Sequence, residues 1–121
     1  PDQWDFALYN LWRPLYAPVL QSPLTLVDAS TMDQDDIVEY RLMPSGETSK
    51  AALPVHNQAQ RLYYFPDMRP DEVLVFKQQD SREGVARVCP HTAFIDPTAP
   101  VDAPDRRSID IRILCIFRKA A

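Results

Sequence analysis

Apolar residues in this chain come in short runs that are separated by proline and polar turn residues. Several runs are rich in β-branched and aromatic residues, which is typical of β-strands rather than of helices. We predict strands at residues 7–12, 24–27, 36–41, 61–65, 72–77, 85–89 and 109–117. The last run alternates isoleucine with polar residues and then becomes wholly apolar, which predicts burial on both faces at its end.

The segments between these runs contain residues that begin and end structural elements. Asp28 and Ser30 can cap a helical turn, and the acidic residues 33–36 suit the first turn of a short helix. Residues 43–52 are polar and include Pro44, so they predict a surface loop. Short strands with proline-rich connections predict a mainly β fold with short helices, either a sandwich or a jelly roll.

Length and composition indicate one folded domain. A chain of 121 residues has room for a single domain, which we take as residues 1–121. Hydrophobic residues make up 45% of the chain and charged residues 25%, so a core is expected. The 12 prolines and 2 glycines disfavour long helices, because proline removes a backbone donor and interrupts the helical turn.

The charge and the apolar runs restrict the expected partners. The 13 Lys and Arg residues against 17 Asp and Glu give a net charge of -4, the wrong sign for binding phosphate backbones, so we expect no nucleic acid partner. No apolar run approaches the roughly 20 residues of a membrane span, so no membrane partner is expected either. Cys89 and Cys115 lack Cys-x-x-Cys spacing, which favours a reducing, cytoplasmic location.

His91 is the first candidate for chemistry. It follows the run at residues 85–89, and strand ends on a rigid sheet are common places for reactive side chains. A neutral imidazole there could ligate a metal or move a proton. The alternative is a structural histidine bonded to a backbone carbonyl, and the residue type alone favours that alternative.

The second candidate is the pair Arg106 and Ser108, where the last strand opens. Side chains alternate along a strand, so a guanidinium and a hydroxyl two residues apart share a face. Together they could bind a carboxylate, the arginine through two hydrogen bonds and the serine through one. The alternative is a solvated ion pair of Arg106 with Asp102 or Asp105, which has little effect on stability.

Two further features have structural explanations. An aromatic cluster in the second half of the chain could line a pocket, although aromatic residues on strands more often form the core; its members are Tyr63, Tyr64, Phe65 and Phe76. Asp80 and Ser81 follow a strand and can form a side-chain turn.

The order of short motifs along the chain resembles the fungal hydroxylase/desaturase family related to gibberellin desaturase and the cephamycin methoxylase components. The motifs are Asn-Leu-Trp-Arg-Pro-Leu at 10–15, Pro-Leu at 23–24 with Asp28, Tyr-Tyr-Phe-Pro-Asp-Met at 63–68, Phe-Lys at 76–77 with Asp-Ser at 80–81, Pro-His-Thr-Ala-Phe at 90–94 and Arg-Arg-Ser-Ile-Asp-Ile-Arg at 106–112. The resemblance extends from about Asn10 to Phe117.

This resemblance implies a non-haem Fe(II), 2-oxoglutarate-dependent oxygenase on a double-stranded β-helix, a variant of the jelly roll. Such enzymes hold iron through two histidines and one carboxylate. By motif match, His91 is the distal iron ligand, and Arg106 with Ser108 holds the distal carboxylate of 2-oxoglutarate. Tyr64 and Phe94 are the expected apolar walls of a pocket for a small, largely apolar metabolite that is hydroxylated or desaturated.

The sequence departs from the family pattern at the other iron ligands. The resemblance places a proximal His-x-Asp or His-x-Glu upstream of the Trp-Arg-Pro segment, and neither motif occurs in these 121 residues. We therefore expect the C-terminal part of an oxygenase-like β-helix, catalytic only if a proximal pair comes from outside the chain. A partial barrel has open strand edges, which favours a homo-oligomer or pairing with a chain that supplies the missing half.

Two other functions remain open at this point. One is a metal-free member of the family that acts as a binding or dimerisation subunit. The other is a metal-independent isomerase or cyclase that uses His91 as a base.

Overall fold

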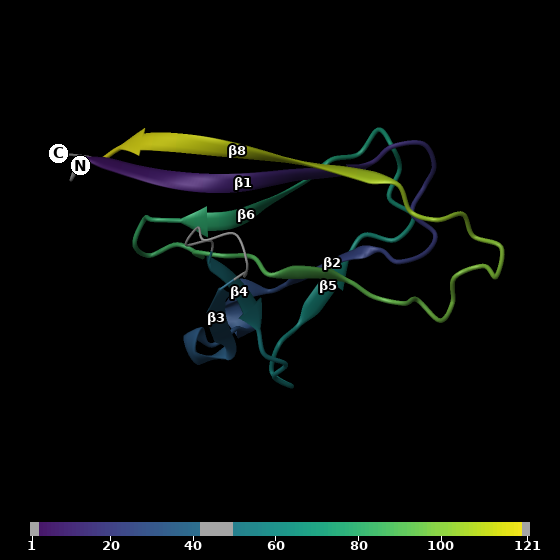
Figure 1. Cartoon of the computed structure of the whole chain (residues 1–121), viewed down its shortest axis with the longest axis horizontal. Coiled ribbons are helices and arrows are strands. Elements are labelled where there is room, and N and C mark those ends of the chain that lie inside the picture. Colours follow the sequence, from purple (N-terminus) through teal and green to yellow (C-terminus); the bar gives the residue numbers. More distant parts are fainter. Residues whose placement is uncertain (1–2, 42–49, 120–121) are drawn as a thin grey trace.

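The computed structural model describes residues 3–41 and 50–119, which form two antiparallel three-stranded sheets and a hairpin (Figure 1). The first sheet has the order β6-β1-β8, with β6 at Leu74–Asp80, β1 at Trp4–Pro14 and β8 at Ser108–Arg118. The second has the order β5-β2-β7, with β5 at Leu62–Tyr64, β2 at Leu24–Val27 and β7 at His91–Ala93. The hairpin joins β3 (Ile37–Arg41) to β4 (Lys50–Pro54), and two 3-10 helices, η1 (Ala29–Thr31) and η2 (Gln34–Asp36), precede it.

β1 is the central strand of the larger sheet. It pairs with β8 along its whole length, from Trp4 opposite Arg118 to Pro14 opposite Ser108. Its other edge pairs with β6, with an irregularity in register between Leu8 and Tyr9. β1 and β8 are therefore fixed to each other more extensively than any other two strands described here.

The core lies between the two sheets. Its buried members come from β1, β6 and the loops, and they are Trp12, Val19, Met68 and Phe76. Leu24 and Leu26 of β2 pack against this cluster from the second sheet. These two residues are two positions apart, so they lie on one face of the strand, and that face defines the inner side of the second sheet. Figure 1 shows the two layers, with β1, β6 and β8 above β2 and β5.

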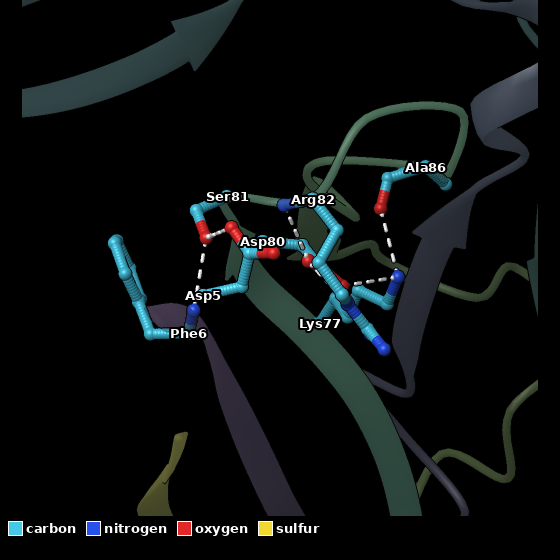
Figure 2. A network of polar contacts seen from close by, with 7 residues as sticks. All are labelled: Asp5, Phe6, Lys77, Asp80, Ser81, Arg82 and Ala86. Carbon is cyan, nitrogen blue, oxygen red and sulfur yellow. Dashed lines mark hydrogen bonds and ion pairs between the residues drawn. The ribbon is translucent and has the colours of Figure 1, made fainter. Parts of the chain in front are cut away.

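A polar network closes the end of the larger sheet where β6 stops (Figure 2). Asp80 is fully buried, and its carboxylate accepts hydrogen bonds from Arg82 at 2.7 and 2.9 Å and forms an ion pair with Lys77 at 2.7 Å. The Ser81 hydroxyl donates to Asp5 and accepts from the Phe6 backbone N–H. The Arg82 guanidinium also lies 4.3 Å from the ring centroid of Phe117. The network thus joins all three strands of the sheet.

The same contacts shift the pKa values of Asp80 and Arg82 in opposite directions. The hydrogen bonds from Arg82, then those from Lys77, hold the pKa of Asp80 well below its ordinary value, and the carboxylate correspondingly raises the pKa of Arg82. The backbone N–H of Arg82 donates to the Asp80 side chain at 3.0 Å. The side-chain turn predicted at Asp80 and Ser81 is therefore confirmed.

Most of the predicted elements are present. The strand at residues 24–27 has the predicted bounds, and strands lie within or across the predicted segments at 7–12, 36–41, 61–65, 72–77 and 109–117. Asp28 caps η1, because its side chain accepts a hydrogen bond from the Ser30 backbone N–H. The jelly-roll class is confirmed, and the predicted short helices are the two 3-10 turns.

Three sequence-based expectations about the fold were wrong. Residues 85–89 form no strand, and regular pairing begins instead at His91. The reason is Pro90, which has no backbone N–H and cannot lie inside a ladder. The loop expected at 43–52 was also wrong at its end, because β4 begins at Lys50 and pairs with β3. Residues 43–49 of that prediction lie outside the described residues.

The third correction concerns β8. We expected burial on both faces at its end, but Leu114 is 59% exposed and Ile116 is 63% exposed. β8 pairs with β1 at one edge, and within the described chain no other strand pairs with its second edge. The apolar side chains at the end of β8 are therefore exposed, and among the described strands its second edge is unpaired as well.

Candidate functional site

The inner face of the larger sheet is lined by both apolar and polar side chains. Residues directly opposite each other on antiparallel strands share a face. Trp12 lies opposite Asp110, and Asn10 lies opposite Phe76 on one side and Arg112 on the other. Since Trp12 and Phe76 belong to the core cluster, Asp110 and Arg112 also lie on the face that points toward the second sheet.

His91 lies on the inner face of the second sheet. It is opposite Leu26, which packs against the core, and its ring lies 4.5 Å from the ring of Phe76 between centroids. Nδ1 is 3.2 Å from the carbonyl oxygen of Cys89. Since that oxygen can only accept, the contact favours the tautomer with the proton on Nδ1, in which Nε2 is free to bind a metal. His91 begins β7, whereas the sequence analysis placed it just after a strand.

Arg106 lies two residues before β8, beside the inner face. Its Nη1 donates to the Ser22 carbonyl at 2.6 Å, and its Cζ lies 5.6 Å from the Trp12 ring centroid. Among the described residues, neither Asp102 nor Asp105 forms an ion pair with Arg106; Asp105 instead accepts from Gln21 at 3.3 Å. The guanidinium therefore has donors left for an external carboxylate.

Ser108, the predicted partner of Arg106, is the first residue of β8 and lies opposite Pro14. Pro14 is two positions from Trp12, so Ser108 shares the inner face with Trp12. We expected Arg106 and Ser108 to share a face because side chains alternate along a strand. That argument requires both residues to lie in the strand, but β8 begins only at Ser108. Arg106 reaches the inner side through the adjoining segment, which is held to β1 by a hydrogen bond from the Leu15 N–H to the Arg107 carbonyl.

Tyr64 and Phe94 contact each other, with ring centroids 5.0 Å apart and planes at 77°. Tyr64 lies opposite Thr25, which in turn lies opposite Thr92. These residues occupy the face of the second sheet opposite to that of Leu26 and His91. The structure therefore brings Tyr64 and Phe94 together but does not place Tyr64 on the His91 face.

Sequence reasoning did not single out Asn10, which is buried on the inner face of the larger sheet. Its side chain is fully buried, and Nδ2 donates to Gln78 at 3.0 Å and to Asp110 at 3.3 Å. Its Oδ1 is buried with no partner among the described residues. A polar residue in the middle of an apolar strand is the signal that could have identified it.

The described residues offer only part of a metal site. Across residues 3–41 and 50–119, no group of three or more His, Cys, Asp or Glu side chains could hold a metal ion. The residues present therefore do not fit a complete iron centre, whereas Arg106 fits a carboxylate. Burial raises the pKa of the Cys89 thiol, which argues against a thiolate ligand there.

A cleft of about 300 Å³ includes Arg106 in its lining. It is lined by residues 16–19 and 104–107. Among the described residues, no helix is long and apolar enough to cross a membrane.

The fold defines the class of protein first: two facing antiparallel sheets with a partly polar interior form part of a double-stranded β-helix. Comparison with solved structures agrees. Two structures of the iron and alpha-ketoglutarate-dependent endoperoxidase NvfI superpose with TM-scores of 0.84 and 0.87, at 33% and 34% sequence identity. They match 96% and 95% of this chain, but only 43% and 42% of the NvfI chain.

The family follows from the sequence. The chain belongs to the family described as YDMC, oxidoreductase/YMDC permease-like domain, whose profile matches residues 3–116. It is 38% identical to aspirochlorine biosynthesis protein N of Aspergillus oryzae over 116 residues, 91% of this chain and 48% of that protein. It is 37% identical to the Fe(II)/2-oxoglutarate-dependent dioxygenase nvfI of Aspergillus novofumigatus, over 93% of this chain and 41% of that protein.

A third relative carries the hydroxylase/desaturase name. It is asaB of Aspergillus flavus, 35% identical over 93% of this chain and 56% of that protein. The chain thus spans about half the length of the curated relatives it matches. The resemblance to fungal hydroxylase/desaturase and Fe(II)/2-oxoglutarate oxygenase proteins is confirmed.

Proposed function

We propose that this chain is the C-terminal part of an Fe(II)/2-oxoglutarate-dependent oxygenase and supplies the 2-oxoglutarate site and one iron ligand. In this proposal, 2-oxoglutarate is the co-substrate, and a small, largely apolar metabolite is hydroxylated or desaturated. The observation that carries the proposal is Arg106, whose guanidinium lies beside the inner face with no carboxylate partner in the described chain. The similarity to nvfI and asaB supports the reaction class.

Arg106 and Ser108 are the proposed receptor for the distal carboxylate of 2-oxoglutarate. A guanidinium that already donates to one carbonyl can still offer its Nε and Nη2 edge to two carboxylate oxygens. Ser108 lies on the inner face and can add one hydrogen bond from its hydroxyl. Their role is binding and orientation of the co-substrate rather than proton transfer.

His91 is the proposed iron ligand, through Nε2. The Cys89 carbonyl accepts from Nδ1 and Phe76 packs against the ring, so both the tautomer and the ring position suit a ligand. When bound, iron supplies the activation of dioxygen. The other ligands are missing from the described chain, so we propose that a segment outside it supplies the proximal His-x-Asp and lies beside β8 and β7.

Tyr64 and Phe94 remain the proposed apolar walls of the substrate pocket, although they lie on the face of the second sheet opposite to His91. A cytoplasmic location also remains a proposal. Some relatives are named for biosynthesis of a fungal metabolite, as in aspirochlorine biosynthesis protein N, which supports a small-molecule substrate.

The test is an anaerobic Fe(II) titration with 2-oxoglutarate, read by the weak visible charge-transfer band of the chelated co-substrate. The chain is titrated alone and after co-expression with the upstream half of nvfI, which replaces the missing segment. We expect no stoichiometric band from the chain alone, a band from the assembly, and loss of that band in His91→Ala. The matched control is His56→Ala, which removes the other histidine and should keep the band.

Two results would overturn the proposal. A stoichiometric band from the chain alone would mean that a complete iron site exists here without a second segment. A band that survives in the His91→Ala assembly would remove His91 from the site. If the assembly forms and binds neither iron nor 2-oxoglutarate, the metal-free binding or dimerisation subunit becomes the better function.

The metal-independent isomerase or cyclase has less support. It requires an acid or base that faces His91, and within the described chain the ring contacts are the Cys89 carbonyl and Phe76.

A further inference from the structure

We propose that Trp12 and Ser22 are positioning residues that hold the Arg106 guanidinium in one orientation, as a pre-formed receptor for a carboxylate. This inference rests on the proposed 2-oxoglutarate site and adds to it the residues that make the site rigid. Neither residue needs to touch the co-substrate, since each would act through Arg106.

Trp12 fixes the plane of the guanidinium. Its indole is 5% exposed and is packed in the core with Val19, Met68 and Phe76. The Arg106 Cζ lies 5.6 Å from the ring centroid, within the range of a cation–π contact. Because the indole is fixed by the core, a guanidinium that packs on it has little freedom to turn.

Ser22 fixes one end of the guanidinium. Its carbonyl accepts from Arg106 Nη1 at 2.6 Å. Ser22 has φ of +50°, a left-handed conformation that side-chain-bearing residues adopt at some cost in free energy. It also precedes Pro23, which further restricts the backbone. Residues in such rarely populated backbone conformations are concentrated at active sites and ligand-binding sites.

A second contact holds the Ser22 loop against the segment that carries Arg106. Gln21 Nε2 donates to the Ala103 carbonyl at 2.9 Å and to Asp105 at 3.3 Å. The loop is also tied to the core, because the Val19 N–H donates to the Met68 carbonyl at 3.0 Å. The loop that carries Ser22 and the segment that carries Arg106 are therefore held together by hydrogen bonds. The Nε and Nη2 edge of the Arg106 guanidinium is left for a ligand.

The orientation of Arg106 can be measured without any ligand. The Arg106 Nε–H signal, assigned by its loss in Arg106→Lys, should be shifted upfield by the Trp12 ring. In Trp12→Leu and in Ser22→Val the signal should move to the position of an exposed arginine. Valine is chosen because a β-branched residue resists positive φ, whereas Ser22→Gly accepts it and should keep the wild-type signal.

The effect on binding is measured by calorimetry with 2-oxoglutarate as the titrant. Arg106→Lys should weaken binding by about tenfold or more, because lysine lacks the fork. Trp12→Leu and Ser22→Val should each weaken it about three- to tenfold, the range of one cation–π contact or hydrogen bond. Trp12→Phe should recover part of the loss. Val27→Ala is the control, since it removes buried packing at a residue outside the core cluster that contains Trp12.

The outcomes separate this inference from the proposed function. If Arg106→Lys weakens binding but Trp12→Leu and Ser22→Val bind as tightly as wild type, the positioning roles are wrong while the 2-oxoglutarate site stands. If the Arg106 signal is that of an exposed arginine in the wild-type chain, the positioning roles are also wrong. If the signal is shifted as expected but 2-oxoglutarate does not bind, the proposed function fails and Arg106 is no carboxylate receptor.

Discussion

Asp80 shows how a single buried charge links three strands. Its carboxylate is fully buried and bound to both Arg82 and Lys77, while neighbouring Ser81 contacts β1. Removing one partner from such a group leaves the other charge buried without compensation. The strength of the network therefore depends on Asp80 being ionised.

Stability should fall in acid as this network is lost. The folded pKa of Asp80 lies below the unfolded value of about 3.8, so its contribution is complete above that value and is lost as pH falls through and below it. We expect the melting temperature of the chain to drop between pH 5 and pH 2. In Asp80→Asn, the melting temperature should be lower at pH 7 and the drop in acid shallower.

Melts at several pH values check this expectation, with Asp102→Asn as the control for an exposed carboxylate. The hydrogen bonds at Asp28, Asp36, Asp71 and Asp96 also lower their pKa values, so some acid sensitivity should remain. An acid profile in Asp80→Asn that is parallel to wild type would contradict the role of this network.

Asn10 should contribute little to stability despite its burial. Its Oδ1 has no partner, and an unsatisfied buried acceptor is unfavourable. Its two acceptors, Gln78 and Asp110, are not fully buried, so they can bind water when Asn10 is lost. We expect Asn10→Leu to change the free energy of unfolding by less than about 1 kcal/mol, in either direction.

Urea denaturation measures the effect. Trp12→Leu, at the next inward position of β1, is the comparison and should lose about 2 kcal/mol or more through the lost core packing. If Asn10→Leu lowers the free energy of unfolding as much as Trp12→Leu does, the hydrogen bonds of the Asn10 amide stabilise the sheet and this prediction is wrong.

At the scale of elements, the sequence predicted the positions of most strands but not which face of each strand is buried. The strand at 24–27 was predicted with its bounds because both proline and polar residues delimit it. His91 was placed after a strand rather than in one because pairing with β2 begins only beyond Pro90. β4 was missed because its partner β3 stabilises it, and such tertiary contacts cannot be read from local composition.

β8 shows the same limit for the candidate site. Ile109, Ile111 and Ile113 alternate with Asp110 and Arg112, and a sheet with one solvated face would bury the isoleucines. The register with β1 places Asp110 and Arg112 inward, so the usual pattern is inverted. Residue types could suggest His91 and Arg106, but only loop contacts could place Trp12 and Ser22 around Arg106.

The outer face of β8 should make the isolated chain self-associate. Leu11 lies opposite both Val75 and Ile111, so an apolar row crosses all three strands of the sheet, and Ile111 is 52% exposed. We expect Ile111→Thr with Ile113→Thr to reduce association, since threonine keeps the strand propensity while it removes apolar surface.

Light scattering during gel filtration measures the molar mass of both forms. The double variant should run closer to the monomer, with a melting temperature within a few degrees of wild type because neither side chain is buried. The control is Val38→Thr on the β3–β4 hairpin, an equally exposed apolar residue away from this sheet. If that control reduces association as much as the double variant, the apolar row is not the contact surface.

For the whole molecule, the small core and the large exposed apolar surface predict a low free energy of unfolding. The buried apolar side chains of the described chain are few, and they are Ala7, Trp12, Val19, Val27, Met68 and Phe76. In the same described residues, β8 exposes apolar side chains on both faces, and its second edge has no partner strand. A chain that buries so little should unfold with a free energy at or below about 5 kcal/mol, the lower end of the range for single domains.

A segment that pairs with β8 should therefore stabilise the chain and cover its apolar surface together. The isolated chain should bind a dye for exposed apolar surface, and co-expression with the upstream half of nvfI should lower that binding and raise the melting temperature. In Ile111→Lys the stabilisation should be weaker, because a charge at the contact must be desolvated, while Val38→Lys on the hairpin should respond as wild type. If the isolated chain binds no dye and unfolds cooperatively with a free energy near 10 kcal/mol, the fold is self-sufficient and the metal-free subunit gains support over the half-enzyme.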